Sequence, residues 1–319
     1  MKTRLAAIAA AVAAMLAGGS ALAKDAVRLV DSQGQIYLDW GMYEAQTKGF
    51  YDAENLDATI IVGRGGADSL QAVVTGSQDI VFGTGILGVV GAYSKGAPIT
   101  IIGSTMLGAP DTFWYVKSDS PIKTLKDLDG RSFAFTTPGS LTHILVQTIA
   151  KELAINPKFQ STGNISAVRT MMMSGQIDTA WSAFPTNLDI VRKGEIRIIG
   201  NGNDAKAMST MTLRVTVANT GWLDKNRDVA VRAMRALWKG QVAAMTDTTA
   251  FDRFAAHWQI PVEDARRVPD FYSLEAMRFF PLRGLDETLR LAQEYGFIKE
   301  PPTDEQKKGL VTVVYDPRK

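Results

Sequence analysis

Short apolar runs alternate with longer amphipathic stretches along the first part of the chain. A run of four to eight apolar residues is typical of a buried strand, whereas apolar positions recurring every three to four residues are typical of a helix. Helical patterns at 37–50 and 68–76 lie between these runs. The alternation predicts βαβ units and a mainly parallel sheet. The strands are expected at 26–31, 58–63, 78–83, 99–104 and 112–118.

A second series of the same kind begins after Asp119. Helices are expected at 140–155 and 165–176, and a further strand, at 212–218, leads out of the series. From about Asp228 onward the pattern is mostly helical. The chain therefore contains two α/β series in succession. Strands of the second series are expected at 128–137, 177–184 and 196–201.

One motif occurs at the same place in both series. Gly76 to Phe82 reads G-x-x-D-x-x-aromatic, and Gly175 to Trp181 repeats that pattern 99 residues later. In each case a helix is expected to end at the glycine, and the aspartate to begin a short strand. The repeat indicates two similar lobes whose equivalent strand ends face each other.

Two facing α/β lobes predict a ligand cleft, because open α/β sheets bind ligands beyond the carboxyl ends of their strands. We expect 112–118 and 212–218 to be crossing strands that join the lobes. The first lobe would then be discontinuous, comprising 24–114 and 216–319, and the second lobe would comprise 115–215. Closure of the lobes about the crossings would enclose the ligand.

The composition and the amino-terminal segment indicate the cellular compartment of the protein. Residues 1–23 combine two early cations, an Ala/Leu-rich run and Ala21-Leu22-Ala23, the pattern of a cleavable secretory signal. The sequence contains no cysteine, which excludes disulfides, thiolate metal sites and lipid attachment at an amino-terminal cysteine. The formal charge of +2 on 319 residues, without a basic run, argues against nucleic-acid binding. We expect a protein exported to the periplasm.

Five segments carry a family resemblance: 37–60, 65–84, 120–135, 173–199 and 216–240. Their content and order across about 27–245 resemble periplasmic substrate-binding proteins of ABC importers. The subgroup is the NMT1/THI5-like one, which includes binders of sulfonates, taurine, nitrate and thiamine pyrimidine precursors. The resemblance implies a type II periplasmic-binding-protein fold, a membrane permease as partner and no catalysis.

Gly83, Gly85 and Gly88 also match the G-x-G-x-x-G spacing of a dinucleotide site. Such a site needs an acidic residue about 20 positions later to hold the ribose, but no acid occurs before Asp111. We therefore interpret Thr84 and Gly85 as a strand-to-helix turn whose hydroxyl and amides face a ligand.

The stretch TTPGSLTHIL is expected to form the corresponding turn of the second lobe. Ser140 is a plausible helix N-cap, and the free amides that follow it can receive an anion; the two roles are compatible. Ser140 and His143 also allow a hydrolase interpretation, but no acid lies nearby in sequence and no G-x-S-x-G elbow exists. The ligand candidates here are Thr137, Gly139, Ser140, Leu141 and Thr142.

The remaining candidates are two arginines and several polar or aromatic residues near strand ends. Arg64 either pairs with an anionic ligand or is solvated, and Arg214 needs either an internal carboxylate or a ligand in the cleft. Trp181 and Phe184 are expected as cleft walls. The segment after the first strand offers Gln33, Gln35 and Tyr37.

These features predict a periplasmic solute-binding protein that closes around a small organic anion, a sulfonate or carboxylate with an aliphatic or aromatic body. The first alternative is a binding protein for a neutral pyrimidine-type vitamin precursor. The second alternative is a pyrimidine-synthase-like enzyme of the same fold. The two histidines and the absence of a paired acidic motif predict no metal site and no cofactor. We expect a monomer that delivers its solute to ABC permease subunits.

Overall fold

The computed structural model describes residues 23–32 and 34–318. Residues 1–22 of the expected signal peptide, and Gln33, lie outside the described residues. None of the described helices combines the length and the apolar character needed to cross a membrane. The described strands are β1 (Asp25–Asp31), β2 (Leu56–Val62), β3 (Ile80–Gly85), β4 (Ile99–Leu107), β5 (Thr112–Lys117), β6 (Ser132–Phe135), β7 (Lys158–Ser161), β8 (Ala180–Ala183), β9 (Ile196–Asn201) and β10 (Thr212–Asn219).

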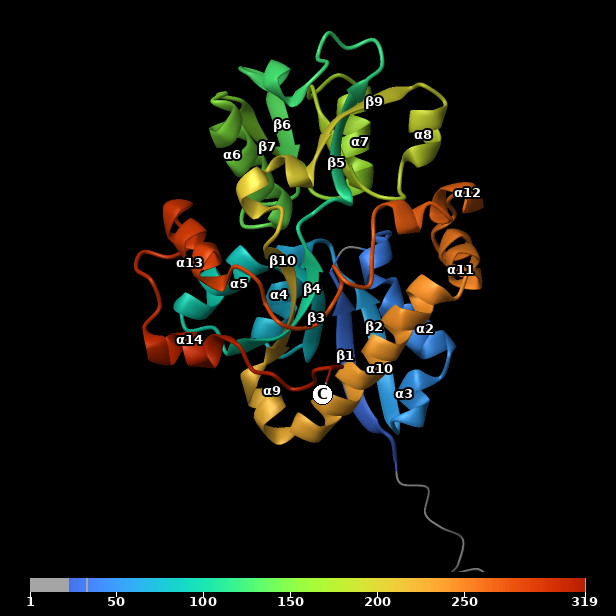
Figure 1. Cartoon of the computed structure of the whole chain (residues 1–319), viewed down its shortest axis with the longest axis vertical. Helices are drawn as coiled ribbons and strands as arrows, with labels where there is room; N and C mark the ends of the chain where they lie inside the picture. The colour runs from blue at the N-terminus through green and yellow to red at the C-terminus, as the bar shows by residue number, and fades with distance from the viewer. Residues whose placement is uncertain (1–22, 33, 319) are drawn as a thin grey trace, which may run out of the picture.

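A five-stranded sheet with the order β2-β1-β3-β10-β4 forms the centre of the first lobe (Figure 1). β1 pairs in parallel with β2 and β3, as the βαβ pattern predicts. β10 runs antiparallel between β3 and β4, because it returns from the other half of the molecule. The sheet is therefore mainly parallel, and the carboxyl ends of β1, β2, β3 and β4 point toward the second lobe.

The second lobe contains two small sheets, β8-β5-β9 and β6-β7 (Figure 1). β5 is antiparallel to both of its neighbours, and β6 is parallel to β7. β6 lies beside β8, although side chains rather than a backbone ladder join them. The resulting order is β7-β6-β8-β5-β9. It corresponds strand by strand to the order β2-β1-β3-β10-β4 of the first lobe, with β5 in the antiparallel place of β10. β7, an exposed strand, is absent from the strands that the apolar pattern predicts.

The repeated G-x-x-D motif has the same structural role in both lobes. The backbone N–H of Arg28 on β1 donates to Asp79, just before β3, over 2.8 Å. The backbone N–H of Ser132 on β6 donates to Asp178, just before β8, also over 2.8 Å. Each aspartate thus fixes the start of one strand against its neighbour, so the sequence echo reflects a structural repeat.

Two segments connect the lobes. The chain leaves the first lobe after β4 through 108–111 and returns through 202–211, so these two segments, next to β5 and β10, form the crossings. The segment 202–211 contains the short 3-10 helices η3 (Gly202–Asp204) and η4 (Lys206–Met208). The division at 114/115 and 215/216 stays a prediction.

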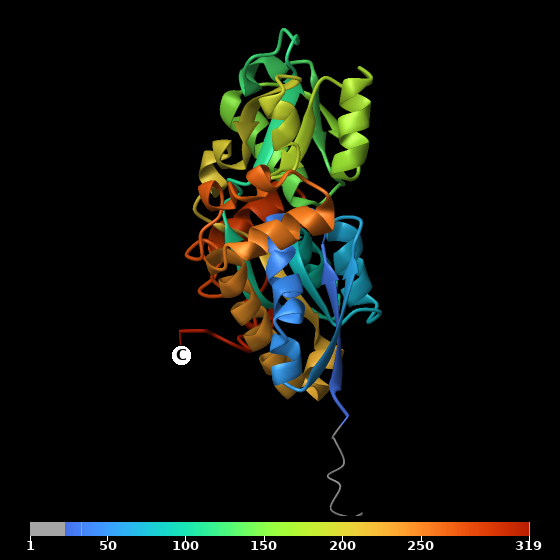
Figure 2. The same ribbon diagram turned by 90° about the vertical axis from the view of Figure 1, so that its right-hand side faces the viewer.

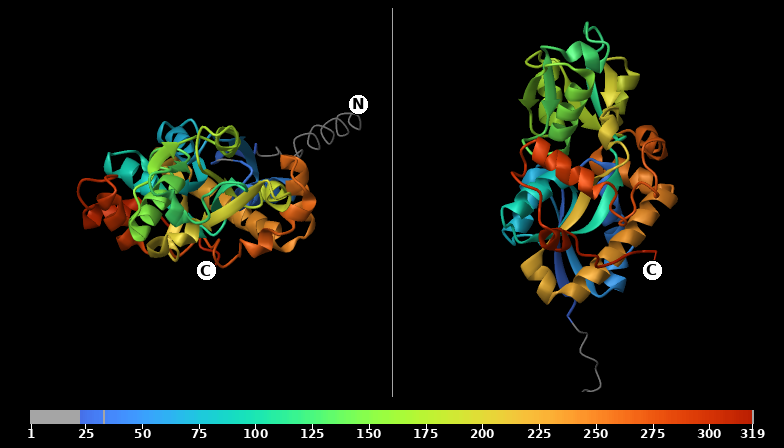
Figure 3. Two further views of the ribbon diagram at one scale, coloured as in Figure 1. Left: turned by 90° about the horizontal axis from the view of Figure 1, so that it is seen from above. Right: turned by 60° about the vertical axis from the view of Figure 1, so that its left-hand side comes forward.

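Helices cover both faces of the five-stranded sheet. α2 and α10 lie side by side on one face and α4 lies on the opposite face (Figure 2). α13, the second-last helix of the chain, packs on α5 (Figure 3). The described helices are η1 (Tyr37–Asp39), α2 (Trp40–Thr47), α3 (Phe50–Ala53), α4 (Gly66–Val74), α5 (Ile86–Ser94), η2 (Leu125–Leu128), α6 (Leu141–Leu153), α7 (Ile165–Met173), α8 (Leu188–Arg192), α9 (Thr220–Lys225), α10 (Arg227–Thr246), α11 (Thr249–Trp258), α12 (Val262–Ala265), η5 (Val268–Asp270), α13 (Leu285–Glu294) and α14 (Asp304–Leu310).

Candidate functional site: the cleft between the lobes

The two turns that the sequence singled out meet where the lobes face each other. A Cβ atom at Gly85, the last residue of β3, would lie 3.1 Å from the backbone nitrogen of Leu141, the first residue of α6. A Cβ atom at Gly88 would lie 2.9 Å from the carbonyl oxygen of Gly139. The distance at Gly88 is shorter than real Cβ atoms show and the distance at Gly85 is tighter than most, so glycine allows the two backbones to approach this closely. The lobes are therefore in direct contact at this edge of the cleft.

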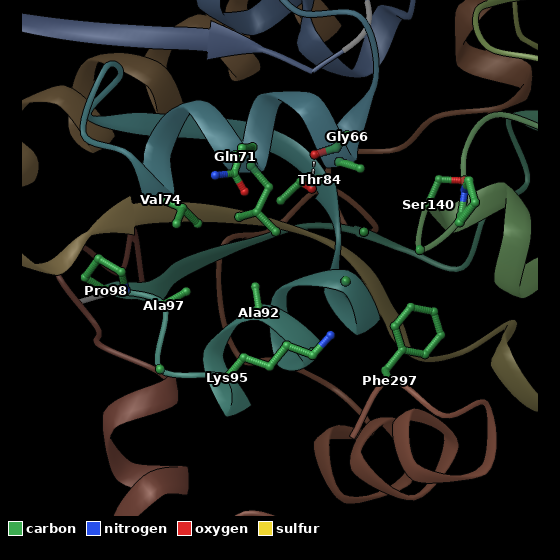
Figure 4. A pocket seen from close by; sticks show the side chains of 18 residues that line it. Gly66, Gln71, Val74, Thr84, Ala92, Lys95, Ala97, Pro98, Ser140 and Phe297 are labelled. Atoms are coloured by element: carbon green, nitrogen blue, oxygen red, sulfur yellow. Dashed lines mark hydrogen bonds between the residues drawn. The ribbon is translucent and has the colours of Figure 1, made fainter. Parts of the chain in front are cut away.

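Thr84, Gly85, Gly139 and Ser140 line one common cavity of about 630 Å³. Figure 4 shows this cavity as a groove between α4 and α5, with Ser140 of the second lobe at one side. The Thr84 hydroxyl donates to the carbonyl oxygen of Gly66 over 3.0 Å, which ties the end of β3 to the start of α4. The sequence therefore brought together residues from both lobes that share one cavity.

The amino terminus of α6 retains unused hydrogen-bond donors directly after Ser140, which lines this cavity. Ser140 Oγ accepts the backbone N–H of His143 and so caps its own helix. Within the described residues, the amides of Leu141 and Thr142 have no hydrogen-bond partner. Unpaired amides at a helix start, together with the helix dipole, favour an anion. The buried hydroxyl of Thr137 also lacks a partner in the described part of the chain.

The side chains around this turn do not form a hydrolase pair. His143 Nδ1 accepts the backbone N–H of Gly139 over 3.2 Å, and its ring stacks on Phe135. Burial lowers the pKa of His143. Thr142 Oγ1 accepts the backbone N–H of Thr136 over 2.9 Å, so this hydroxyl stabilises the turn before α6. The imidazole is thus engaged in fixing the loop and is not positioned to activate Ser140.

A second, polar opening of the cleft holds Gln35 and Arg64. Two adjoining cavities of about 440 and 220 Å³ share Gln35 and the first turn of α7 as walls. The Arg64 side chain is 91% exposed, so its guanidinium is accessible at this rim. Its Nε atom lies 3.8 Å from a carboxylate oxygen of Asp68, which is also exposed. Arg169 of α7 faces the same space from the second lobe. Cations from both lobes therefore line this opening, together with the carboxylate of Asp189.

Contacts across the cleft join the lobes on both sides. The Thr186 hydroxyl donates to the carbonyl oxygen of Gln35 over 2.8 Å. Arg192 of α8 pairs with the buried carboxylate of Asp264 on α12, with 2.8 Å between the charged atoms. Lys151 of α6 forms an ion pair with Glu294 of α13 on the opposite side. The structure thus represents the lobes in contact rather than apart.

Arg214 pairs with an internal carboxylate. Its guanidinium lies 2.9 Å from Asp111 and donates to the Thr112 hydroxyl over 2.8 Å. Burial alone would lower the pKa of Arg214, but the carboxylate of Asp111 raises it above the usual value. Because Asp111 ends one crossing and Arg214 follows the other, this buried pair joins the two connections between the lobes.

Three aromatic candidates lie in packed surroundings rather than along the cavities described above. Tyr37 is fully buried, packs edge-on against Phe254 and donates its hydroxyl proton to the carbonyl oxygen of Ala244. Trp181 is also buried, and it pairs across strands β5 and β8 with Trp114. Phe184 lies between two other rings, with 3.6 Å between its centroid and that of Phe271.

Several residues of the cleft carry no sequence signal that could have identified them. Lys95 and Gln71 line the groove between α4 and α5, and Arg169 lines the polar opening. A charged or amide side chain on an amphipathic helix is ordinarily interpreted as solvated surface. Only the packing of the helices shows that these three side chains border a cavity.

The comparisons with known proteins agree with this architecture. Residues 40–249 match the NMT1/THI5-like family. No curated protein sequence matches the chain.

Similar solved structures share the fold at low sequence identity. The periplasmic aliphatic sulphonate binding protein SsuA from Escherichia coli has a TM-score of 0.72 and 18% identity, covering 91% of this chain and 92% of that chain. The alkanesulfonate-binding protein SsuA from Xanthomonas axonopodis pv. citri bound to MOPS has a TM-score of 0.73 and 18% identity, covering 92% and 99%. The desulfurization enzyme DszB is also similar, with a TM-score of 0.59 and 15% identity, covering 88% and 95%.

The expected two-lobed fold is confirmed by the paired α/β lobes and by these structural similarities. The match to the family covers well over half of the chain. The chain belongs to the NMT1/THI5-like family and has the fold of periplasmic binding proteins.

Proposed function

We propose that the protein is the periplasmic solute-binding component of an ABC importer and captures a small organic anion, a sulfonate or carboxylate, between its lobes. The observation that carries this proposal is the shared cavity at the turns Thr84-Gly85 and Gly139-Ser140. A solute placed there touches both lobes at once. Two of the similar structures, the SsuA proteins of Escherichia coli and Xanthomonas axonopodis pv. citri, are sulfonate-binding proteins, which supports the same class of solute.

The helix start at Leu141 and Thr142 supports an anionic group in particular. Their amides have no hydrogen-bond partner among the described residues, and the positive end of the α6 dipole lies at the same place. Arg64 and Arg169 add positive charge at the polar opening. A neutral pyrimidine-type solute would use the amides but would gain nothing from the arginines.

The mechanism is a population shift. A solute that contacts both lobes binds more tightly to the closed state than to an open one, and this difference in affinity moves the equilibrium toward closure. The closed form is the one that the permease would recognise. Export by the segment 1–23, the periplasmic location and a monomeric state belong to the same proposal, and catalysis does not.

A ligand panel tests this function. Isothermal titration and thermal unfolding of the purified protein with short sulfonates and carboxylates should give binding and a rise in the unfolding temperature. Native mass spectrometry of fresh protein should show a co-purified small anion. A panel without any binding, together with binding of a neutral pyrimidine, would replace the anion by the alternative solute; turnover of that compound would establish an enzyme.

Two substitutions at one position test the anion-binding helix start. Leu141→Pro removes the first amide of α6 and keeps a backbone that suits the first helical position. Leu141→Ala removes the same apolar side chain but keeps the amide. Affinity for the anion should fall about tenfold further in Leu141→Pro than in Leu141→Ala, the loss of one charge-assisted hydrogen bond. Equal losses in both variants would exclude this amide from the site.

Replacing Arg64 separates anionic from neutral solutes. Arg64→Ala should weaken binding of an anion by at most several-fold and leave binding of a neutral ring unaffected, because an almost fully exposed cation contributes modestly. Arg278→Ala is the matched control, since Arg278 is an exposed, paired arginine outside the cavities described above. A similar effect of both substitutions would exclude a specific role for Arg64.

A further inference from the structure

We propose that the groove between α4 and α5 holds the apolar body of an elongated anionic solute, with a second acceptor group at its far end beside Lys95. This inference rests on the proposed function and deepens it by naming the shape of the solute. The anionic head would lie at the interlobe turns, and the body would extend along the first lobe.

The first argument is continuity. One cavity includes Thr84, Gly85 and Ser140 at the lobe contact and extends to Ala97 and Pro98 beyond the end of α5 (Figure 4). Its volume of about 630 Å³ is within the range of small-molecule pockets. A molecule the size of a short sulfonate would fill only the interlobe end. The remaining length is available to a longer solute.

The second argument is the chemistry of the walls. Leu70 and Val74 of α4 and Ala92 of α5 present apolar surface to the groove. Gly88 and Gly91 of α5 also line the groove and add no polar side chain to it. Apolar walls favour a hydrocarbon or ring-bearing body, because removing each CH₂ group from water is favourable.

The third argument is charge. No Asp or Glu is among the residues that line the groove, and Lys95 is the cation among them. Its ammonium group has no ion pair or hydrogen bond within the described residues. Figure 4 shows the Lys95 side chain running from the end of α5 back along the groove, with its nitrogen on the side of Phe297, and Gln71 of α4 on the opposite wall. Both side chains can donate to a second acceptor group of a solute that lies in the groove.

Chain length provides the test of the groove. Titration of the purified protein with ethane-, butane-, hexane- and octanesulfonate should give a dissociation constant that falls about threefold to fourfold for each buried CH₂. Ala92→Phe, which fills the groove, should abolish this dependence on chain length. Ala256→Phe adds the same ring to an exposed position of α11 and should preserve the dependence.

Lys95 is tested by the charge at the far end of the solute. Octane-1,8-disulfonate should bind several-fold more tightly than octanesulfonate, and Lys95→Met should remove that preference. Lys225→Met is the matched control, because Lys225 is an exposed lysine at the end of α9 outside the groove. A preference that survives Lys95→Met would overturn the role of this residue.

The outcomes distinguish the inference from the function on which it rests. Binding of short sulfonates without length dependence overturns the groove and leaves the proposed function intact. Length dependence that persists in Ala92→Phe also overturns the groove. Absence of binding by every sulfonate and carboxylate overturns both. Circular dichroism of each variant shows that a lost response does not come from misfolding.

Discussion

Gly88 lies against Gly139 so closely that a methyl group on Gly88 would come within 2.9 Å of the Gly139 carbonyl oxygen. The two residues belong to different lobes, one on α5 and the other in the turn before α6. A substitution at Gly88 is therefore expected to act in opposite directions on two properties: the stability of α5 and the approach of the two lobes.

Gly88→Ala should leave the fold intact and weaken closure. Alanine stabilises a helix by about 1 kcal/mol relative to glycine, so the unfolding temperature should stay the same or rise. The added methyl group should push the lobes apart, increase the radius of gyration in small-angle scattering and lower solute affinity several-fold. Gly221→Ala is the control, because a Cβ atom there lies no closer than 3.4 Å to another residue's atoms. An unchanged radius and affinity in Gly88→Ala would contradict this role.

Replacing one member of the Arg214–Asp111 pair should strongly destabilise the protein. Both side chains are at most 5% exposed, so Asp111→Asn or Arg214→Met leaves a buried charge without its partner. The expected loss is about 3 to 5 kcal/mol of unfolding free energy, measured by urea denaturation. The double variant should recover part of it. Asp68→Asn at the exposed Arg64 pair should change stability by less than about 1 kcal/mol, and a similar small effect at Asp111 would refute the prediction.

Asp39 should make the protein less stable as pH rises. Burial, followed by the nearby charge of Asp31, raises the pKa of Asp39 well above its ordinary value of 3.8, although Arg214 opposes the shift. The folded state then holds a proton that the unfolded state releases, so unfolding free energy decreases with rising pH above about 4, by up to about 1.4 kcal/mol per pH unit. Asp39→Asn should remove this slope and stabilise the protein near neutrality.

Urea denaturation between pH 4 and 7 measures the effect of Asp39→Asn. The exposed Asp57 offers a matched control, since Asp57→Asn makes the same chemical change on the surface of β2. If both variants kept the pH dependence of the parent protein, Asp39 would not be its source.

The two repeated aspartates should differ in how much they stabilise the fold. The side chain of Asp79 is 3% exposed and also pairs with the Arg28 guanidinium, whereas that of Asp178 is 35% exposed. Asp79→Ala should therefore cost about 2 to 3 kcal/mol, and Asp178→Ala about 1 kcal/mol, because water replaces an exposed hydrogen bond more readily. Chemical denaturation compares the two variants directly. A larger loss at Asp178 would show that exposure does not govern these contacts.

The same motif shows how far the sequence determines the architecture. Asp79 and Asp178 follow a helix and precede an apolar run, so their spacing revealed the repeat before any coordinates were known. The apolar pattern likewise predicted β1, β3 and β10. It did not reveal β7, whose side chains are exposed on both faces and leave no periodic signal.

The candidate site was only partly accessible from the sequence. Thr84 and Ser140 were found because strand-to-helix turns have local signatures. Aromatic residues near strand ends gave no such guidance: Phe184 is stacked between rings contributed by β5 and by a segment near residue 271. Which face an aromatic ring covers depends on packing between distant segments, and no local pattern encodes it. The partner of Arg214 was undetermined for the same reason.

The glycine contact at the lobe edge has a consequence for engineering. An added Cβ atom at Gly88 would meet only backbone atoms of Gly139, so the tightest contact at this edge does not depend on the side chains of the groove. A library that varies Leu70, Val74 and Ala92 can therefore change the groove while Gly88 keeps the backbone contact between the lobes.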